Sequence, residues 1–284
     1  MAFRRIVRQH QAFRDDIGDL VTRRPLPGPA LAHLDPFLFL NHHGPQVYPP
    51  GNRGLPFGPH PHRGFETVTF ILSGELAHRD SGGHESVIHA GGAQWMTAGA
   101  GLVHSELSPA SFMRTGGPLE ILQLWVNLPA RLKMAKPAYI GLEASDLAAI
   151  RGSDDRVTVE LVSGTLDGRA GPIQSLTDIH LMVVKAKAGG AIDLPVAPGR
   201  AVFLYVVGGD ITVDGAPASA QHLIELDQEG DAVRIAATSD AVALFGHGLA
   251  YGEPIVSHGP FVMNTREEIV RAIEDYQAGR FPGL

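Results

Sequence analysis

Two histidine-containing pairs in the first half of the chain have the residue types and spacing of a metal site. His60 and His62 flank a proline in the stretch FGPHPHRGFE, and His104 stands two residues before a glutamate in MTAGAGLVHSE. Side chains two residues apart on a strand point to the same face, and a residue before proline favours extended backbone. If the two segments are neighbouring strands, three imidazoles and the carboxylate of Glu106 can converge on one divalent ion.

The surroundings of these pairs carry more information than the pairs themselves. Because the 284 residues include 14 histidines, about 0.7 His-x-His triplets are expected by chance. Gly54 precedes the first pair by six residues, and Glu66 follows it by four. An apolar strand pattern then ends at Gly74, and the second pair follows the glycine-rich turn AGAG. Without this context, solvated or hydrogen-bonded histidines would be the simpler interpretation.

The segments that must position these residues have the pattern of short β-strands. Most apolar runs are four to eight residues long, contain β-branched or aromatic residues, and are bounded by Gly, Pro, Asp or Asn. Glycine (34) and proline (21) are spread along the chain, which indicates frequent turns. The sequence therefore predicts an all-β protein of sandwich or barrel type. The runs are FLFL (37–40), ETVTFIL (66–72), ESVIH (85–89), LEILQLWVNL (119–128), VTVELV (157–162), HLMVVKA (180–186), AVFLYVV (201–207), DITVD (210–214), QHLIEL (221–226) and AVALFG (241–246).

The chain is predicted to divide into two halves of similar length. We expect an N-terminal domain over residues 1–130, a crossover linker over 131–142 and a C-terminal domain over 143–284. A shift of 134 residues places HPH (60–62) on LPV (194–196), with the apolar run that follows also in register. The second half is therefore interpreted as a repeat of the first that carries apolar residues in place of imidazoles.

One helix is expected near the end of the chain, in NTREEIVRAIEDYQAGRFPG. Thr265 and Glu268 form a capping box, in which the hydroxyl and the carboxylate each satisfy an end amide. An apolar stripe follows at helical spacing, and a glycine and a proline then end the helix. The stripe consists of Ile269, Ile273 and Tyr276. We expect this helix to pack on the C-terminal domain in a structural role.

The composition excludes several classes of protein. Because the chain has no cysteine, a metal must be held by nitrogen and oxygen. A formal net charge of −7 argues against nucleic acid as a direct partner. No apolar run is long enough to span a membrane, and the N-terminus lacks the apolar core of a secretory signal. We expect a cytoplasmic monomer without nucleic-acid or membrane partners.

The motifs around the two pairs resemble those of known families. The cupin pattern, G-x5-H-x-H-x3-E followed by a glycine, is matched by Gly54, His60, His62, Glu66 and Gly74. More specifically, HPHRGFETVTFILSGELAHRDS, QWMTAGAGLVHSE and LQLWVNLPARLKM resemble the signature of the pirin family, and so does the C-terminal segment. The similarity covers nearly the whole chain.

This resemblance implies a bicupin, with two β-barrel domains of the double-stranded β-helix (jelly-roll) type and a short C-terminal helix. It also implies a mononuclear iron in the N-terminal barrel alone, with His60, His62, His104 and Glu106 as ligands. The cupin consensus would use Glu66 as the carboxylate ligand, but pirin-like sequences use the His-x-Glu pair. We therefore assign Glu66 a place beside the ligands. Fe(II) is the expected ion, and Zn, Ni, Cu, Mn or Co would fit the same donors.

The resemblance also implies a reaction, since bacterial pirin-like proteins are similar to quercetin 2,3-dioxygenases. The expected activity is cleavage of quercetin, or of a related flavonol or aromatic enol, with O2. Glu106 or Glu66 would remove the proton of the substrate hydroxyl, and the sequence does not choose between them. The alternative is a non-catalytic, iron-dependent redox sensor that regulates a protein partner.

The other histidines are predicted to lie outside the site. His42 and His43 are adjacent, so at most one of them could face it. Three in the polar hairpin AHRDSGGHESVIHA are expected in solvent, namely His78, His84 and His89. Those in the second half form no His-x-His or His-x-Glu pair, which favours a metal-free barrel; they are His180, His222, His247 and His258.

Overall fold

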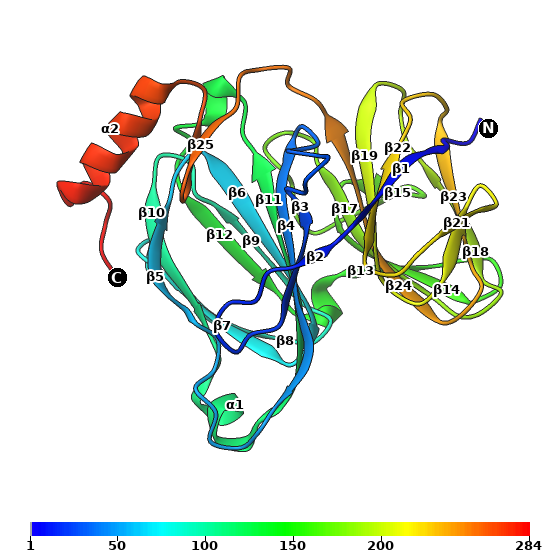
Figure 1. Cartoon of the computed structure of the whole chain (residues 1–284), viewed down its shortest axis with the longest axis horizontal. Coiled ribbons are helices and arrows are strands. Elements are labelled where there is room, and N and C mark those ends of the chain that lie inside the picture. Colours follow the sequence, from blue (N-terminus) through cyan, green and yellow to red (C-terminus); the bar gives the residue numbers. More distant parts are fainter. Residues whose placement is uncertain (1) are drawn as a thin grey trace. The chain divides into compact units, whose positions relative to one another are not determined.

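The computed structural model describes residues 2–284 and confirms the all-β prediction (Figure 1). Most of the chain lies in short antiparallel strands joined by turns, as the glycine and proline content predicts. Two compact units are present, which we call the first barrel and the second barrel. The first barrel consists of Arg14–Arg23, Phe37–Ala144 and Tyr251–Leu284. The second barrel consists of the residues up to Phe13, Arg24–Pro36 and Ser145–Ala250.

The first barrel is built from two main sheets. A seven-stranded sheet has the order β12-β9-β6-β11-β4-β3-β2, and a four-stranded sheet has the order β5-β10-β7-β8. Its strands are β2 (Phe13–Arg14), β3 (Thr22–Leu26), β4 (Phe37–Tyr48), β5 (Phe57–His62), β6 (Phe65–Ser73), β7 (Glu75–Asp80), β8 (Glu85–His89), β9 (Ala93–Thr97), β10 (Leu102–Leu107), β11 (Gly117–Asn127) and β12 (Ala138–Leu142). Short helical turns connect them at α1 (Ala110–Thr115), η1 (Ala130–Leu132) and η2 (Ala144–Asp146). Because successive strand residues alternate in direction, every second side chain of these strands faces the interior.

The second barrel repeats this plan with its own sheets. A seven-stranded sheet has the order β1-β22-β19-β24-β17-β14-β13, a four-stranded sheet has the order β18-β23-β20-β21, and β15 pairs with β16. Its strands are β1 (Ile6–Gln11), β13 (Ala148–Arg151), β14 (Val157–Ser163), β15 (Thr165–Leu166), β16 (Arg169–Ala170), β17 (His180–Ala186), β18 (Ala191–Pro195), β19 (Arg200–Gly208), β20 (Ile211–Val213), β21 (Ala216–Ala218), β22 (His222–Leu226), β23 (Ala232–Ala237) and β24 (Ala241–Leu249). Its interior is one large apolar cluster, to which Leu194 and Val196 both belong.

The two ends of the chain belong to units other than those expected from the sequence. Strand β1 pairs with β22 of the second barrel, whereas the final residues belong to the first barrel. Strand β12 lies inside the expected linker and pairs with β9 of the first barrel. These assignments follow from backbone pairing between distant segments, which the local strand pattern does not encode.

The C-terminal helix has the predicted ends and a different position. In α2 (Arg266–Gln277), Thr265 and Glu268 form the capping box that the sequence predicts. The helix packs on the hairpin of β25 (Val256–His258) and β26 (Phe261–Met263), and Figure 1 shows it beside them. Ile269 is buried with Val103 and Phe281 of the first barrel. None of the helices among residues 2–284 has the length and apolar character that crossing a membrane requires.

Candidate metal centre

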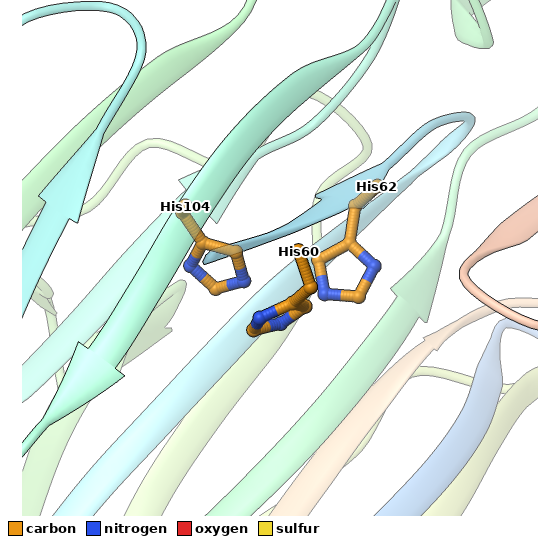
Figure 2. A group of neighbouring side chains, drawn as sticks. All are labelled: His60, His62 and His104. Atoms are coloured by element: carbon orange, nitrogen blue, oxygen red, sulfur yellow. The ribbon is translucent and has the colours of Figure 1, made fainter. Parts of the chain in front are cut away.

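Strands β5 and β10 bring three histidines side by side (Figure 2). The strands pair antiparallel, with His104 opposite His60 and with Leu102 opposite His62. The ring centroid of His104 lies 4.4 Å from that of His60 and 5.0 Å from that of His62. One nitrogen from each ring lies within 4.8 Å of the other two, and these rings form the one such group found over residues 2–284. We call these three residues the histidine trio.

Backbone carbonyls fix which nitrogen of each ring is open to a ligand. The Nδ1–H of His60 donates to the carbonyl oxygen of Gly58 (2.7 Å), and the Nδ1–H of His62 donates to that of Pro260 (3.3 Å). A neutral imidazole that donates from Nδ1 has its lone pair at Nε2. Both ring nitrogens of His104 are buried and have no hydrogen-bond partner among the described residues. The trio therefore offers unshared nitrogen lone pairs, which are what a transition metal binds.

Burial keeps the rings of His62 and His104 in the neutral form. Burial, followed by the neighbouring His60, lowers the pKa of His62 to about 3. The pKa of His104 is also well below its usual value, first because of burial and then because of the adjacent histidines. Neutral rings at physiological pH are ready to bind a cation, whereas protonated rings would repel it. The donor set therefore fits a divalent metal ion.

The Glu106 carboxylate is held apart from the trio. Along β10 it lies on the same face as His104, as the two-residue spacing predicts. One of its oxygens accepts hydrogen bonds from the Thr69 hydroxyl (3.0 Å) and the Gln94 amide, and the other accepts from the Gln123 amide (2.5 Å). Glu106 is not among the groups that lie within 4.8 Å of one another. The structure thus brings together three of the four expected ligands and holds the fourth with other partners.

Glu66, which was expected beside the ligands, does not share the face of the histidines although it stands an even number of residues from both. A shared face would need unbroken strand between His62 and Glu66, but Gly64 has a φ of +89° and interrupts it. Phe65 contacts the ring of His62, so the next residue along β6 faces the other way. There the Glu66 carboxylate accepts a hydrogen bond from Thr97 (2.6 Å). Burial raises the pKa of Glu66, and the Thr97 hydrogen bond opposes this only in part.

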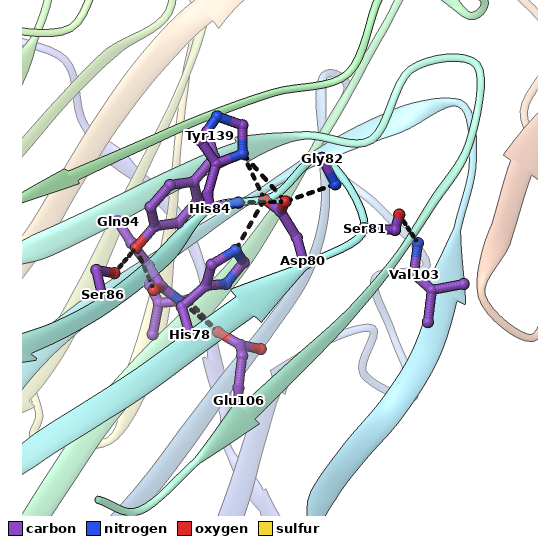
Figure 3. A network of polar contacts seen from close by, with 11 residues as sticks. His78, Asp80, Ser81, Gly82, His84, Ser86, Gln94, Val103, Glu106 and Tyr139 are labelled. Atoms are coloured by element: carbon purple, nitrogen blue, oxygen red, sulfur yellow. Dashed lines mark hydrogen bonds and ion pairs between the residues drawn. The ribbon is translucent and has the colours of Figure 1, made fainter. Parts of the chain in front are cut away.

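His78 is buried beside the site, which corrects the expectation that it is solvated. It lies opposite Glu106 across the β7–β10 pair, and its ring stacks on that of Tyr139 at 3.9 Å (Figure 3). Its Nε2 lies 3.0 Å from the Asp80 carboxylate, which also contacts the half-exposed His84. The two-residue spacing of His78 and Asp80 could have indicated a same-face pair. That His78 lies near Glu106 could be known only from the register of β7 and β10.

One of the two adjacent histidines in the middle of β4 faces the interior near Glu106. His43 lines a narrow pocket together with Glu106 and the apolar side chains of Leu55, Phe57 and Ile121. Its Nδ1 lies 2.9 Å from the Thr22 hydroxyl. This agrees with the rule that at most one of the adjacent pair can face the site, and it adds an apolar wall beside the carboxylate.

The C-terminal segment supports the trio from outside. It supplies the Pro260 carbonyl that accepts the His62 Nδ1–H. Arg63, the residue after His62, donates from Nη1 to the Asp275 carboxylate of α2 (2.7 Å). The Arg63 guanidinium also lies 4.5 Å from the centre of the Phe281 ring. A helix more than 200 residues away in sequence is therefore tied to the backbone next to a candidate ligand.

Two protein-family models match the chain. The family described as Pirin matches residues 19–126, and the Pirin C-terminal cupin domain matches residues 181–282. One match lies in each half of the chain, so the predicted bicupin fold is confirmed.

Individual relatives cover nearly the whole chain. A pirin-like protein of Caulobacter vibrioides is 41% identical over 95% of this chain and 96% of that protein. Pirin of Homo sapiens is 37% identical over 90% of this chain and 86% of that protein. A crystal structure of a quercetin 2,3-dioxygenase from Acinetobacter baumannii matches with a TM-score of 0.93 and 33% identity, over 99% of both chains. A nickel(II) complex of a bacterial pirin from Escherichia coli matches with a TM-score of 0.68 and 25% identity, over 86% of this chain and 98% of that one.

Proposed function

The chain belongs to the pirin family, and from this premise we propose that its first barrel is the site of a metal-dependent dioxygenase. The proposed substrate is quercetin or a related flavonol or aromatic enol. Both oxygen atoms of O2 enter the ring-opened product and one ring carbon leaves as carbon monoxide, so no further reductant is needed. The observation that carries the proposal is the convergence of three imidazoles, each with a ring nitrogen that has no hydrogen-bond partner among the described residues.

The proposed metal is Fe(II), with the histidine trio and Glu106 as its ligands. Three nitrogens and one oxygen leave two positions of an octahedron for other ligands. When bound, the ion supplies the redox chemistry with O2 and polarises the substrate oxygen. Nitrogen and oxygen donors also suit Zn, Ni, Cu, Mn and Co, and the nickel complex of the bacterial pirin supports testing several ions.

Glu106 is the proposed base for the proton of the substrate hydroxyl, a role that it would take after releasing the metal ion. The hydrogen bonds from Thr69, Gln94 and Gln123 then hold its carboxylate in one orientation, on the face of β10 that carries His104. A base must lie within hydrogen-bond reach of the proton that it removes, and a fixed carboxylate meets this requirement better than a mobile one. Glu66 takes no part, because its carboxylate is bonded to Thr97 on the other face of β6.

The narrow pocket beside Glu106 combines an apolar wall with polar groups. Leu55, Phe57 and Ile121 form the wall, and Gln123 adds a polar group near the carboxylate. The pocket volume of about 10 Å³ holds about one water molecule, so an aromatic ring would bind there only if these side chains moved apart. Ligand sites commonly combine an apolar wall with a few polar groups that fix orientation. An apolar wall also excludes water from the reacting atoms.

Oxygen uptake and carbon monoxide release by the metal-loaded full chain test the proposal. We expect equal amounts of O2 consumed and carbon monoxide released with quercetin. His62→Ala should abolish both, whereas His89→Ala, a change at an exposed histidine of the same barrel, should leave both unchanged. Absence of turnover with each of the six divalent ions, in protein that binds them, would reject the dioxygenase and leave a non-catalytic metal protein.

A regulatory role is the second candidate, and one observation favours it. A surface groove of about 660 Å³ lies against β5 and β10 and is lined by Pro59 and Ser105, each a direct neighbour of a trio histidine. A protein partner bound there would contact the strands that carry the proposed ligands. In that case, oxidation of bound iron should change the affinity for the partner while quercetin remains uncleaved.

A further inference from the structure

The second barrel has a cleft of about 330 Å³ where the internal repeat aligns it with the histidine trio. Pro195 and Val196 line it, and they correspond to the last two residues of HPH (60–62). His180 and His247 lie opposite each other on β17 and β24 and also line it, with ring centroids 4.3 Å apart. Sequence reasoning treated these two histidines as scattered, whereas strand pairing brings them together.

A buried arginine, Arg200, is the positively charged residue that lines this cleft. Arg200 is 6% exposed, and its Nε–H donates to Nδ1 of His247 (2.7 Å). Its Nη1 donates to the Asp178 carboxylate (2.6 Å), and its Nη2 donates to the carbonyl oxygens of Asp178 and His247. A guanidinium has five N–H groups, so one N–H on Nη1 remains without a partner among the described residues.

Together the two histidines of the cleft offer one free N–H donor and no free lone pair. Because an arginine always carries its proton, Nδ1 of His247 must accept, and the ring proton lies on Nε2. This Nε2–H has no partner among the described residues, although His247 is 3% exposed. His180 accepts from the Thr165 amide at Nδ1 and lies 3.1 Å from Asp178 at Nε2. With both rings so engaged, the cleft suits a hydrogen-bond acceptor and does not suit a metal ion.

The charges near the cleft favour an acceptor with a single negative charge. Burial lowers the pKa of His247, the positive charges of Arg200 and the buried Arg4 both lower it further, and among the nearby carboxylates Asp178 raises it. The exposed carboxylate of Asp231 stands at the edge of the cleft. Because Asp178 already pairs with Arg200, the repulsion by Asp231 is not offset by a free positive charge on Arg200, and it grows with the charge of the ligand; a doubly charged anion is therefore disfavoured. The apolar side chains of Pro195 and Val196 can contact a hydrocarbon group.

We propose that the second barrel binds a small monocarboxylate, whose oxygens accept the free Nη1–H of Arg200 and the Nε2–H of His247. Paired N–H donors match the geometry of a carboxylate. The site is separate from the histidine trio and does not depend on the dioxygenase proposal.

Calorimetric titration of the full chain with benzoate tests the site, with sulfate, which is doubly charged at neutral pH, as the comparison. We expect benzoate to bind more tightly than sulfate. His247→Leu removes the Nε2–H donor and should weaken benzoate binding about tenfold, the loss of one charge-assisted hydrogen bond. His247→Gln keeps an acceptor for Arg200 and a donor for the cleft, so it should retain most of the affinity. Equal affinity in both variants would overturn the proposal.

Two exposed positions give tests that do not depend on the buried network. Ala197→Leu fills the cleft from its rim and should abolish benzoate binding. Asp231→Asn removes the repulsive charge and should tighten benzoate binding about threefold. His62→Ala distinguishes this site from the trio, because it should leave benzoate affinity unchanged. If His62→Ala abolishes benzoate binding and Ala197→Leu does not, the carboxylate binds in the first barrel and the inference is wrong.

Discussion

The two barrels share a fold but differ in what their histidines offer to a ligand. In the first barrel, His60 and His62 donate from Nδ1 to backbone carbonyls and keep lone pairs at Nε2. In the second, Arg200 donates to Nδ1 of His247 and places the ring proton on Nε2. The same residue type thus suits a cation in one barrel and an anion in the other. The partner of the ring decides which ligand it can hold.

The interiors differ in the same sense. The first barrel buries Thr69, Gln94 and Glu106 in one hydrogen-bonded group, whereas the second is filled by a continuous apolar cluster. Buried polar groups are costly unless they are hydrogen-bonded, so a barrel needs a reason to retain them. The polar interior therefore marks the barrel in which chemistry is expected.

Removal of a trio histidine should have the largest effect. His104→Ala deletes the most buried of the three rings. Loss of a group that only hydrogen-bonds to a metal ligand lowers metal affinity by up to about 100-fold, so loss of a ligand itself should lower it further. Titration of the purified chain with Ni(II) or Co(II) measures this. His222→Ala, at a second-barrel histidine outside the cleft, should bind as the wild type does. Unchanged affinity in His104→Ala would place the metal elsewhere.

Two glycines with similar backbone angles should differ in their tolerance of a side chain. Gly64 (φ +89°) lies next to the trio, and a Cβ there would stand 2.0 Å from the Val262 carbonyl oxygen. Gly215 (φ +80°), in a second-barrel hairpin, has no atom within 4 Å of such a Cβ. Gly64→Ala should cost about 3 kcal/mol of unfolding free energy, through backbone strain and steric overlap, against about 1 kcal/mol for Gly215→Ala.

Urea unfolding measures both glycine variants. Tryptophan fluorescence reports the first barrel, because both tryptophans, Trp95 and Trp125, lie in it. Circular dichroism reports the whole chain. If both variants lose the same unfolding free energy, the close approach of the Val262 carbonyl to Gly64 does not constrain the segment after His62.

Local patterns in the sequence predicted the strands, the capping box of α2 and the two same-face pairs on β5 and β10. They succeed where the controlling interactions lie within a few residues. They do not give the direction of the Glu66 side chain, which was expected beside the ligands, because the positive φ of Gly64 interrupts the strand between His62 and Glu66. They also fail for the pair of Arg200 and His247, which are 47 residues apart and meet only through strand pairing. The placement of α2 fails for the same reason, since its partner Arg63 lies in the other half of the chain.

The hydrogen bond between Arg63, the residue after His62, and Asp275 of α2 should have a moderate effect on metal binding. Asp275→Asn removes the charge that holds Arg63, so His62 loses orientation and the Co(II) dissociation constant should rise about tenfold. Glu274→Gln, an exposed neighbour on the same helix, is the matched control and should have no effect. Asp275→Glu should restore part of the affinity. Because the position of the ligand changes, the visible spectrum of bound Co(II) should also shift.

The outcomes of this experiment separate two failures. If the wild type binds no Co(II), the metal-site proposal is wrong. If the wild type binds Co(II), and Asp275→Asn has the same Co(II) dissociation constant as the Glu274→Gln control, the trio remains the metal site. The Arg63–Asp275 hydrogen bond then contributes nothing to its affinity.

The smallest expected effect is a pH dependence shared by the arginine–aspartate pairs of both barrels. Hydrogen bonds from Arg63 and then Arg280 lower the pKa of Asp275. Burial raises that of Asp178, but the hydrogen bond and charge of Arg200 outweigh it, so its pKa is also lowered. A carboxyl with a depressed folded-state pKa contributes stability above its unfolded pKa of about 4, and this contribution is lost as the pH falls through the folded value.

The difference in urea midpoint between the wild type and each of Asp275→Asn and Asp178→Asn should therefore be full at pH 7 and shrink below pH about 4. The Asp275 variant should show the larger difference at pH 7, because the side chain of Asp275 is 15% exposed and that of Asp178 is 66% exposed, while both arginines are buried. A difference that stays constant between pH 7 and pH 3 would mean that the carboxylate charge is not what stabilises the pair. In that case the loss would come from the altered hydrogen-bond geometry and packing of asparagine, because neither changes with pH.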